Sequence, residues 1–316
     1  MGSFILFLLG LILFLYGLNW MRNGMESLAE KKLTTWLLRF TKTPVRGFVT
    51  GTFLTALLQS STAVTVLTIN FVHVGMISFA QSLGIILGSN IGTTITTQIL
   101  ALHIESLSLP LMGLGLLLYF LPKKLFRQLG QVLIGFGAIF LGISWMQTIA
   151  EPLEQAGLLE KLVLSGFSPI GVGLVIGTLI TALIHSSSAT IAMTMGFYAS
   201  GAVPLSFALA VVIGSNVGTC VTALIASYGT STAAQRVAFS HLVLNVVGAF
   251  AFTPLIPWLL TWIPSLSEQS ATQVAHFQTI YNIACSIAVL PFTNAFAKLI
   301  EWMVPDQINP TNSIKT

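Results

Sequence analysis

The sequence predicts an all-α, polytopic membrane protein with two inverted-topology repeats, each containing a re-entrant helical hairpin. Three observations predict this class: long uncharged apolar stretches, an internal repeat, and opposite charge in the equivalent loops of the two halves. Of the 316 residues, 54% are hydrophobic and 7% are charged, against roughly 25% charged in a typical soluble domain. So few polar residues cannot cover a soluble core of this size, which excludes a soluble fold.

The apolar stretches are long enough to cross a membrane. Phe4–Trp20, Gln131–Ile149 and Val237–Ile263 contain no charged residue, and a hydrocarbon core of roughly 30 Å needs about 20 residues of helix. The first stretch lacks a basic leader and a small-residue cleavage site, so we interpret it as a retained spanning helix. Cys220 and Cys285 both fall in apolar segments, which indicates neither a disulfide framework nor a transition-metal site.

An internal repeat relates the two halves. Gly51–Ala63 matches Gly177–Ala189, and Gly88–Thr96 matches Gly214–Thr222, both at an offset of 126 (177 − 51 and 214 − 88). About 18 of the 46 aligned positions from Gly51 to Thr96 are identical by direct comparison. Repeats of this kind define the fold.

The repeat extends to the first helix, because Phe14–Met21 resembles Phe140–Met146 with one residue dropped. We therefore divide the chain into a first repeat (1–127), a second repeat (128–263), an additional C-terminal helix (264–303) and a short tail (304–316).

Charge in the equivalent loops predicts opposite orientations for the two repeats. The polar stretch Met21–Arg46 carries six basic residues, namely Arg22, Lys31, Lys32, Arg39, Lys42 and Arg46. Its counterpart Ala150–Phe167 carries Glu151, Glu154, Glu160 and a single Lys161. Positive charge in short loops marks the cytoplasmic side, so the two loops are expected on opposite faces, as in inverted-topology repeats.

The same rule places the loop around Lys123, Lys124 and Arg127 in the cytoplasm. Two full crossings, Ser78–His103 and Ser106–Leu121, fit between Arg46 and this loop. Gly47–His73 must then enter and return on one side. Its short arms predict a re-entrant hairpin with Gln59–Thr62 at the tip.

The mirrored hairpin is Pro169–Ala199, with His185–Ser188 at its tip. The prediction is a multi-pass plasma-membrane protein, with the N-terminus outside and the C-terminus in the cytoplasm. The alternative is that each motif segment forms one continuous helix of about 25 residues, since membrane helices tolerate Ser and Thr.

The hairpin tips carry the candidate anion-binding residues. A helix that begins at mid-membrane presents free N–H groups and partial positive charge, which suit a small oxyanion. Serine and threonine favour the first position of such a helix. The predicted substrate-binding residues are Ser60, Ser61, Thr62, Ser186, Ser187 and Ser188.

Neutral oxygens near the tips suit a hard cation such as sodium. We find no Asp or Glu inside a predicted span before the final helix, which favours a metal ion over a proton relay. Asn90 and Asn216 are interpreted as secondary helix breaks. The predicted ion-binding residues are Gln59, Thr55, Asn90, Thr93, His185, Thr181, Asn216 and Thr219.

Position 185 leaves two interpretations open. His185 stands where the first repeat has Gln59. It either acts as an amide mimic that hydrogen-bonds, or titrates and makes function pH-dependent. Gly51 and Gly177, in contrast, are expected to serve close helix packing alone.

The paired motifs resemble those of the type II sodium-dependent phosphate cotransporter family, bacterial members included, which carries a Gln-Ser-Ser motif in each of two inverted repeats. The matching residues are Gln59–Thr62 and His185–Ser188, with the Gly-Ser-Asn-x-Gly-Thr segments at 88–93 and 214–219. The resemblance covers nearly the whole chain and implies inorganic phosphate as substrate, sodium as coupling ion, and both Ser-Ser segments in one site. His185 departs from the family's Gln at the position beside the second predicted ion site.

The expected function is sodium-coupled symport of inorganic phosphate by alternating access. We expect phosphate, sodium and membrane lipid as partners, no cofactor and no nucleic acid. The oligomeric state stays open, a homodimer being one option. Three alternatives are a phosphate exporter, a passive oxyanion channel, and an intramembrane serine hydrolase using Ser186 beside His185. The hydrolase is distant, because Gln59 of the first repeat cannot act as a base.

Overall fold

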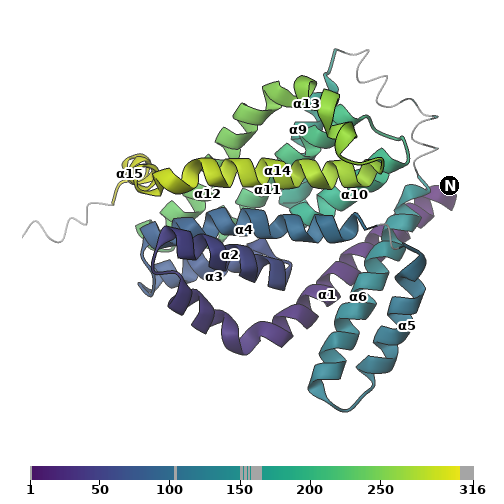
Figure 1. Cartoon of the computed structure of the whole chain (residues 1–316), viewed down its shortest axis with the longest axis horizontal. Helices are drawn as coiled ribbons and strands as arrows, with labels where there is room; N and C mark the ends of the chain where they lie inside the picture. The colour runs from purple at the N-terminus through teal and green to yellow at the C-terminus, as the bar shows by residue number, and fades with distance from the viewer. Residues whose placement is uncertain are drawn as a thin grey trace, which may run out of the picture.

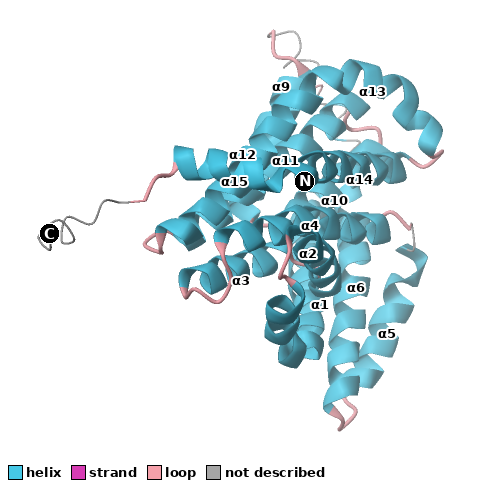
Figure 2. Cartoon of the chain, turned by 60° about the vertical axis from the view of Figure 1, so that its left-hand side comes forward, coloured by secondary structure: helices cyan, strands magenta, loops and turns pink. Residues whose placement is uncertain are grey.

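The computed structural model describes residues 2–102, 105–149 and 166–306, together with 152, 155 and 157; the side chains at 29–34, 38 and 105 lie outside the description. Within these residues the regular structure is helical and no strand occurs, as Figure 2 shows. The acidic loop expected at Ala150–Phe167 falls almost entirely outside the described residues, as does most of the tail.

Six helices or helical runs of the described chain are long and apolar enough to cross a membrane. They are Gly2–Leu28 of α1 (Gly2–Phe40), α4 (Phe79–Leu100), α6 (Lys124–Gln147), α11 (Leu205–Ser227), the run Thr232–Leu266, and the run Ser270–Met303. The run Thr232–Leu266 comprises α12 (Thr232–Phe252) and α13 (Ile256–Trp262), and Ser270–Met303 comprises α14 (Ser270–Val289) and α15 (Thr293–Met303).

The remaining helices are shorter. They are α2 (Pro44–Leu58), α3 (Ser61–His73), α5 (Ser108–Tyr119), α9 (Pro169–Ile184) and α10 (Ser187–Ala199). The full crossing predicted at Ser106–Leu121 stays a prediction, because α5 is apolar but has only 12 residues and is not among the six candidate spans. Leu121-Pro122 follows its end, and a proline cannot continue the preceding helix without losing a hydrogen bond.

The polar stretch after the first apolar segment is not a loop. α1 continues as a single helix to Phe40, and its candidate span includes Arg22 and Glu26. The expectation that no acid lies inside a span before the final helix is therefore wrong for Glu26. Arg22 also lies in this candidate span, so it is not one of the loop charges from which the orientation of the first repeat was predicted.

α1 and α6 lie side by side and antiparallel (Figure 1), and glycines set their close approach. A Cβ atom at Gly10 would lie 2.7 Å from the carbonyl oxygen of Gly142, and one at Gly17 would lie 2.7 Å from that of Gly135. The residue numbers of the contacts run in opposite directions along the two helices. The equivalent helices of the two repeats thus pack against each other.

Within each repeat, the helix before the motif runs parallel to the long helix after it. A Cβ atom at Gly51 of α2 would lie 2.9 Å from Cα of Ile85 in α4, and one at Gly177 of α9 would lie 2.9 Å from Cα of Val211 in α11. The expectation that Gly51 and Gly177 serve close packing is confirmed. Neither position would accept a side chain without a backbone shift.

The secondary breaks predicted at Asn90 and Asn216 are wrong, because α4 and α11 continue through both residues. The nearby glycines serve packing instead. A Cβ atom at Gly92 would lie 2.6 Å from Cβ of Thr55, and one at Gly218 would lie 2.8 Å from Cβ of Thr181. A Gly-x-x-x-Gly spacing permits such contact without interrupting a helix.

The two repeats also exchange contacts at the centre of the molecule. α3 packs on α11 of the other repeat, and α10 packs on α4. α14 lies along α4 (Figure 1), where Ser286 Oγ donates to the carbonyl oxygen of Leu87 at 2.9 Å and the side chains of Thr97 and Gln278 are hydrogen-bonded. The motif helices are therefore enclosed by protein on several sides.

Candidate functional site

Both motifs interrupt their helices in the same way. Gln59 and His185 adopt left-handed backbone angles, with φ of 54° and 58°, and no other non-glycine residue of the described chain has a positive φ. Ser60 and Ser186 then cap the next helix, since their side chains accept from the amides of Ala63 and Ala189 at 3.1 and 3.2 Å. The alternative of one continuous helix is wrong. We call Gln59–Thr62 the first break and His185–Ser188 the second break.

Each break leaves backbone N–H groups free at the start of a helix. Ser61 and Thr62 begin α3, and Ser187 and Ser188 begin α10, so their amides have no acceptor within their own helix. Ser61 is 9% exposed and Ser188 is 2% exposed. Buried helix N-termini of this kind carry a local positive potential.

Arg22 of α1 joins the two breaks. Its Nε donates to the carbonyl oxygen of Gln59 at 2.9 Å, and its Nη2 donates to Ser186 Oγ at 3.0 Å. Glu26, one helical turn further on, attracts the guanidinium. The two breaks are therefore brought together around one half-buried cation.

A narrow pocket lined by residues of both repeats provides a second connection. Thr62 of the first break lines it together with Thr219 and Thr222 of α11 and His241 of α12. Thr222 Oγ1 also lies 2.9 Å from Nδ1 of His185 in the second break. Polar atoms of this pocket remain unpaired, because Thr65 Oγ1 and His241 Nδ1 are buried without a hydrogen-bond partner among the described residues.

The other predicted ion-binding residues lie along α4 and α11, where their side chains mostly bond within the helix. The hydroxyls of Thr93 and Thr219 donate to the carbonyl oxygens four residues earlier at 3.0 and 2.9 Å. Asn216 donates to the carbonyl oxygen of Val212 at 2.9 Å. Asn90 differs, since its Oδ1 lies 3.2 Å from Nε2 of His241.

Thr55 and Thr181 occupy equivalent positions one turn before the two breaks. Both are fully buried. Thr181 Oγ1 donates to Thr190 Oγ1 at 2.8 Å, whereas Thr55 Oγ1 has no hydrogen-bond partner in the described chain.

His185 and Ser186 are not arranged as a base and a nucleophile. His185 faces Thr222, and Ser186 Oγ accepts from Ala189 N and from Arg22. A nucleophile needs its base within hydrogen-bond reach. Gln59, the counterpart of His185, instead donates through Nε2 to the carbonyl oxygen of Ala56 at 2.5 Å, so the two residues bond different partners.

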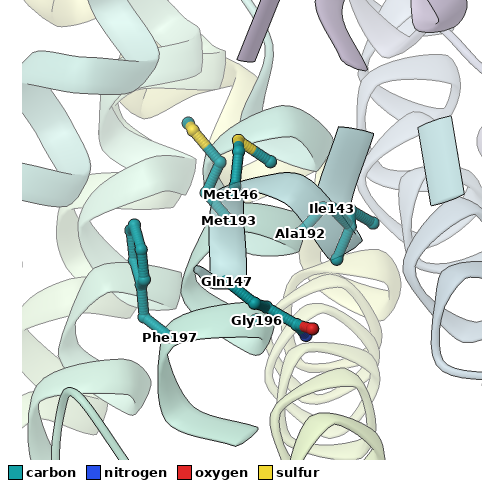
Figure 3. Close-up of a pocket in the computed structure, with 7 residues that line it drawn as sticks. All are labelled: Ile143, Met146, Gln147, Ala192, Met193, Gly196 and Phe197. Atoms are coloured by element: carbon teal, nitrogen blue, oxygen red, sulfur yellow. The ribbon is translucent and has the colours of Figure 1, made fainter. Parts of the chain in front are cut away.

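A separate narrow pocket lies between α6 and α10 (Figure 3). Its wall is apolar, with Met146, Met193 and Phe197 around it, and Gln147 is its one polar side chain. A lining of this kind does not suit an anion.

Four side chains of this region were missed by sequence reasoning: Arg22, Thr65, Thr222 and His241. Arg22 follows an apolar run, which is typical of both interface anchors and buried functional charges. Glu26 follows Arg22 by four residues, a spacing that places both side chains on one face of a helix and could have indicated a paired charge. His241 is a lone histidine in an uncharged stretch, and sequence gave no means to pair it with Asn90.

Comparison with known proteins identifies the family. The family model described as Na+/Pi-cotransporter matches residues 13–148 and 156–259. The protein YqeW of Bacillus subtilis (strain 168) is 36% identical over 299 residues, which cover 93% of this chain and 96% of YqeW.

Two further relatives carry functional names. A protein of Escherichia coli (strain K12) named putative inorganic phosphate export protein YjbB is 30% identical over 93% of this chain, which spans only 54% of that relative. Sodium-dependent phosphate transport protein 2A of Oryctolagus cuniculus is 42% identical over 59 residues, 19% of this chain and 9% of the relative. No solved structure matches the chain. The coverage of the family model, together with the two breaks, shows that the chain belongs to the Na+/Pi-cotransporter family.

Proposed function

We propose that the chain is a secondary active transporter that carries inorganic phosphate in symport with sodium by alternating access. The observation that carries this proposal is the position of Arg22 between the two breaks, hydrogen-bonded to Gln59 and Ser186. A phosphate bound there meets a guanidinium, two helix N-termini and the hydroxyls of both motifs.

The electrostatics of this region favour an anion. A guanidinium has five N–H donors, and the two bonds of Arg22 use two of them. Arginine binds phosphate oxygens well because its donors form a planar fork. The free amides of Ser61, Thr62, Ser187 and Ser188 add donors at helix N-termini, which favour negative charge.

The arrangement of the repeats supports alternating access. The equivalent helices α1 and α6 pack antiparallel, and α3 and α10 each pack on the long helix of the other repeat. Inverted repeats that bind substrate at their interface expose it to either side by rocking of one unit against the other. In this proposal α2–α3 and α9–α10 are re-entrant hairpins in the plasma membrane.

A phosphate exporter is the second candidate. The YjbB relative, named for phosphate export, aligns with 93% of this chain, whereas the sodium-dependent relative aligns with 19%. Direction of flux follows the gradients and the coupling ion. An exporter built on the same phosphate site would transport phosphate without a requirement for inward sodium.

The proposal is tested by uptake of labelled phosphate into proteoliposomes containing the purified protein. An inward sodium gradient is expected to drive uptake, and replacement of sodium by potassium is expected to abolish it. Equal uptake with potassium contradicts sodium coupling and favours the second candidate or a passive pathway.

Ser60→Ala and Ser186→Ala test the site itself. Each removes a hydroxyl of a break and a helix cap worth about 1 kcal/mol. We expect uptake to fall at least tenfold in both variants at unchanged amounts of folded protein, measured by size-exclusion chromatography. Thr68→Val is the matched control, because Thr68 Oγ1 donates only to the carbonyl oxygen of Val64 within α3.

A further inference from the structure

We propose that the contact between α6 and α10 is a closed gate on the substrate path, and that phosphate reaches the two breaks when these helices part. The inference rests on the proposed function and deepens it, because it assigns one route by which the site is reached. The contact surrounds the apolar pocket of Figure 3.

The pocket between α6 and α10 continues toward the ends of two further helices. Two adjoining pockets share four lining residues, which we call the crevice: Ile143, Gln147, Ala192 and Gly196. The second pocket also reaches Leu100, the last residue of α4, and Ala271, near the start of α14. Since α6 ends at Gln147 and α10 ends shortly after Gly196, the crevice lies near one common end of these four helices.

The crevice leads along α10 to the second break. Ser188, Ala192 and Gly196 are spaced four residues apart, so they lie on one face of α10. Ser188 belongs to the first turn of the helix, where the amides are free, and Ala192 and Gly196 line the crevice. A phosphate that enters between α6 and α10 therefore follows this face to the N-terminus of α10.

The contact across the crevice is loose compared with the contact between α1 and α6. A Cβ atom at Gly10 or at Gly17 would lie 2.7 Å from a backbone oxygen of α6. A Cβ atom at Gly196 would meet nothing closer than Cγ of Gln147, at 3.5 Å. α1 and α6 are thus interlocked as one unit, whereas α10 separates from α6 without disengaging backbone atoms.

The side chains around the crevice suit a contact that opens and closes again. Met146, Met193 and Met195 line it, and methionine adapts to a changing surface because its side chain is unbranched and flexible. The rings of Phe7 in α1 and Phe197 in α10 are stacked beside it, with their centroids 6.1 Å apart. A narrow apolar constriction excludes water and ions while it is closed.

The two repeats use equivalent positions differently at this contact. Met146 aligns with Met21 across the dropped residue, so Gln147 aligns with Arg22. Arg22 is hydrogen-bonded to both breaks, whereas the Gln147 side chain makes no hydrogen bond within the described chain. Rocking of one unit of an inverted repeat against the other produces such unequal contacts.

A reversible disulfide across the crevice tests the gate. In a background with Cys220 and Cys285 replaced by alanine, Gln147→Cys is combined with Gly196→Cys. The new sulfur at 147 replaces a Cγ atom that lies 3.5 Å from the Cβ position of residue 196, which is within reach of a disulfide. Oxidation is expected to lower sodium-driven phosphate uptake into proteoliposomes at least tenfold, and reduction with dithiothreitol to restore it. Each single variant is expected to change less than twofold on oxidation.

Gly24→Cys combined with Val132→Cys is the matched control, because it links α1 to α6 inside the unit that stays together. A Cβ atom at Gly24 would lie 2.7 Å from Cγ2 of Val132. Oxidation of this pair is expected to leave uptake within twofold of the reduced protein. Uptake that continues after complete cross-linking of residues 147 and 196 contradicts the gate, as does an equal loss of uptake in the control pair.

Labelling of Ala192→Cys separates the gate from the proposed function. Ala192 is 1% exposed while the crevice is closed. In the same cysteine-free background, Ala192→Cys is expected to react with a membrane-impermeant maleimide from outside, where the second hairpin is predicted to enter. Ala208→Cys, at a fully buried position of α11, is expected to stay unreactive.

The two failures are distinguishable. Reaction of Ala192→Cys from outside without any phosphate uptake would overturn the proposed function and leave the gate standing. Sodium-driven uptake without reaction of Ala192→Cys from outside, or with reaction from the cytoplasmic side alone, would overturn the gate and leave the proposed function standing.

Discussion

Arg22 is the residue whose role depends most on the folded structure. It lies in the candidate span Gly2–Leu28, and its guanidinium bonds one group of each break. A charge so placed within a membrane span is costly unless it is paired or functional. Its two hydrogen bonds tie α1 to both breaks, and in the proposed function its remaining donors bind the anion.

Arg22→Lys is expected to lower the affinity for phosphate at least tenfold. Lysine keeps the charge, but its compact ammonium group cannot span Gln59 O and Ser186 Oγ as a planar fork does. Loss of one hydrogen bond to a charged group corresponds to about 1.5–3 kcal/mol. Isothermal titration of purified protein with phosphate measures the change. Arg39→Lys, at an exposed position of the same helix, serves as the control, and equal affinities in both variants contradict a direct role for Arg22.

Sequence reasoning reached the breaks but not Arg22. Consecutive hydroxyls between two arms of 12 and 10 residues (47–58 and 63–72) predict an interruption, because a helix that short does not cross a membrane. A basic residue after an apolar run, however, fits a cytoplasmic loop as well as a buried site. Only the packing of α1 against both breaks separates the two cases.

At the scale of elements, glycine contacts decide how closely the helices approach. α1 meets α6 through Gly10, Gly17, Gly135 and Gly142, and a Cβ atom at any of these would lie under 3.0 Å from backbone atoms of the other helix. Membrane helices gain little from the hydrophobic effect between them, so such packing is a main source of their association. The Gly-Ser-Asn segments illustrate the ambiguity of sequence: they predicted breaks at Asn90 and Asn216, and the structure uses their glycines for contact.

Gly17→Ala is expected to destabilise the folded protein by about 1–3 kcal/mol, the usual cost of overpacking. The added methyl would lie 2.7 Å from the backbone oxygen of Gly135. Gly113→Ala in α5 is the matched control, because nothing lies within 4 Å of a Cβ atom there and alanine favours a helix by about 1 kcal/mol. Thermal unfolding in detergent compares the two, and a fall for Gly113→Ala as large as that for Gly17→Ala contradicts the packing argument.

At the scale of the whole molecule, alternating access depends on the orientation of the two repeats in the membrane. Charge counting predicted opposite orientations, but Arg22 lies in a candidate span, α5 is not among the candidate spans, and the acidic loop falls outside the described residues. The repeat itself is supported by local geometry, since both breaks share their φ angles and caps. Six candidate spans agree with a multi-pass protein, and the sequence predicted that class from apolar stretches alone.

Lys42 and Ser168 test the orientation directly, because they are equivalent in the repeat (168 − 42 = 126) and both exposed, just before α2 and α9. In a background with Cys220 and Cys285 replaced by alanine, Lys42→Cys is expected to react with a membrane-impermeant maleimide only from the cytoplasmic side. Ser168→Cys is expected to react only from outside. Labelling of both from the same side contradicts inverted topology.

The central claim is that two breaks joined by Arg22 form one phosphate site in a sodium-coupled transporter. Its most direct test is accumulation of labelled phosphate in proteoliposomes that start with equal phosphate on both sides and an imposed inward sodium gradient. We predict a transient internal phosphate concentration above the external one, and its collapse when the sodium gradient is dissipated with an ionophore. Phosphate that only equilibrates across the membrane, whatever the sodium gradient, would contradict the account.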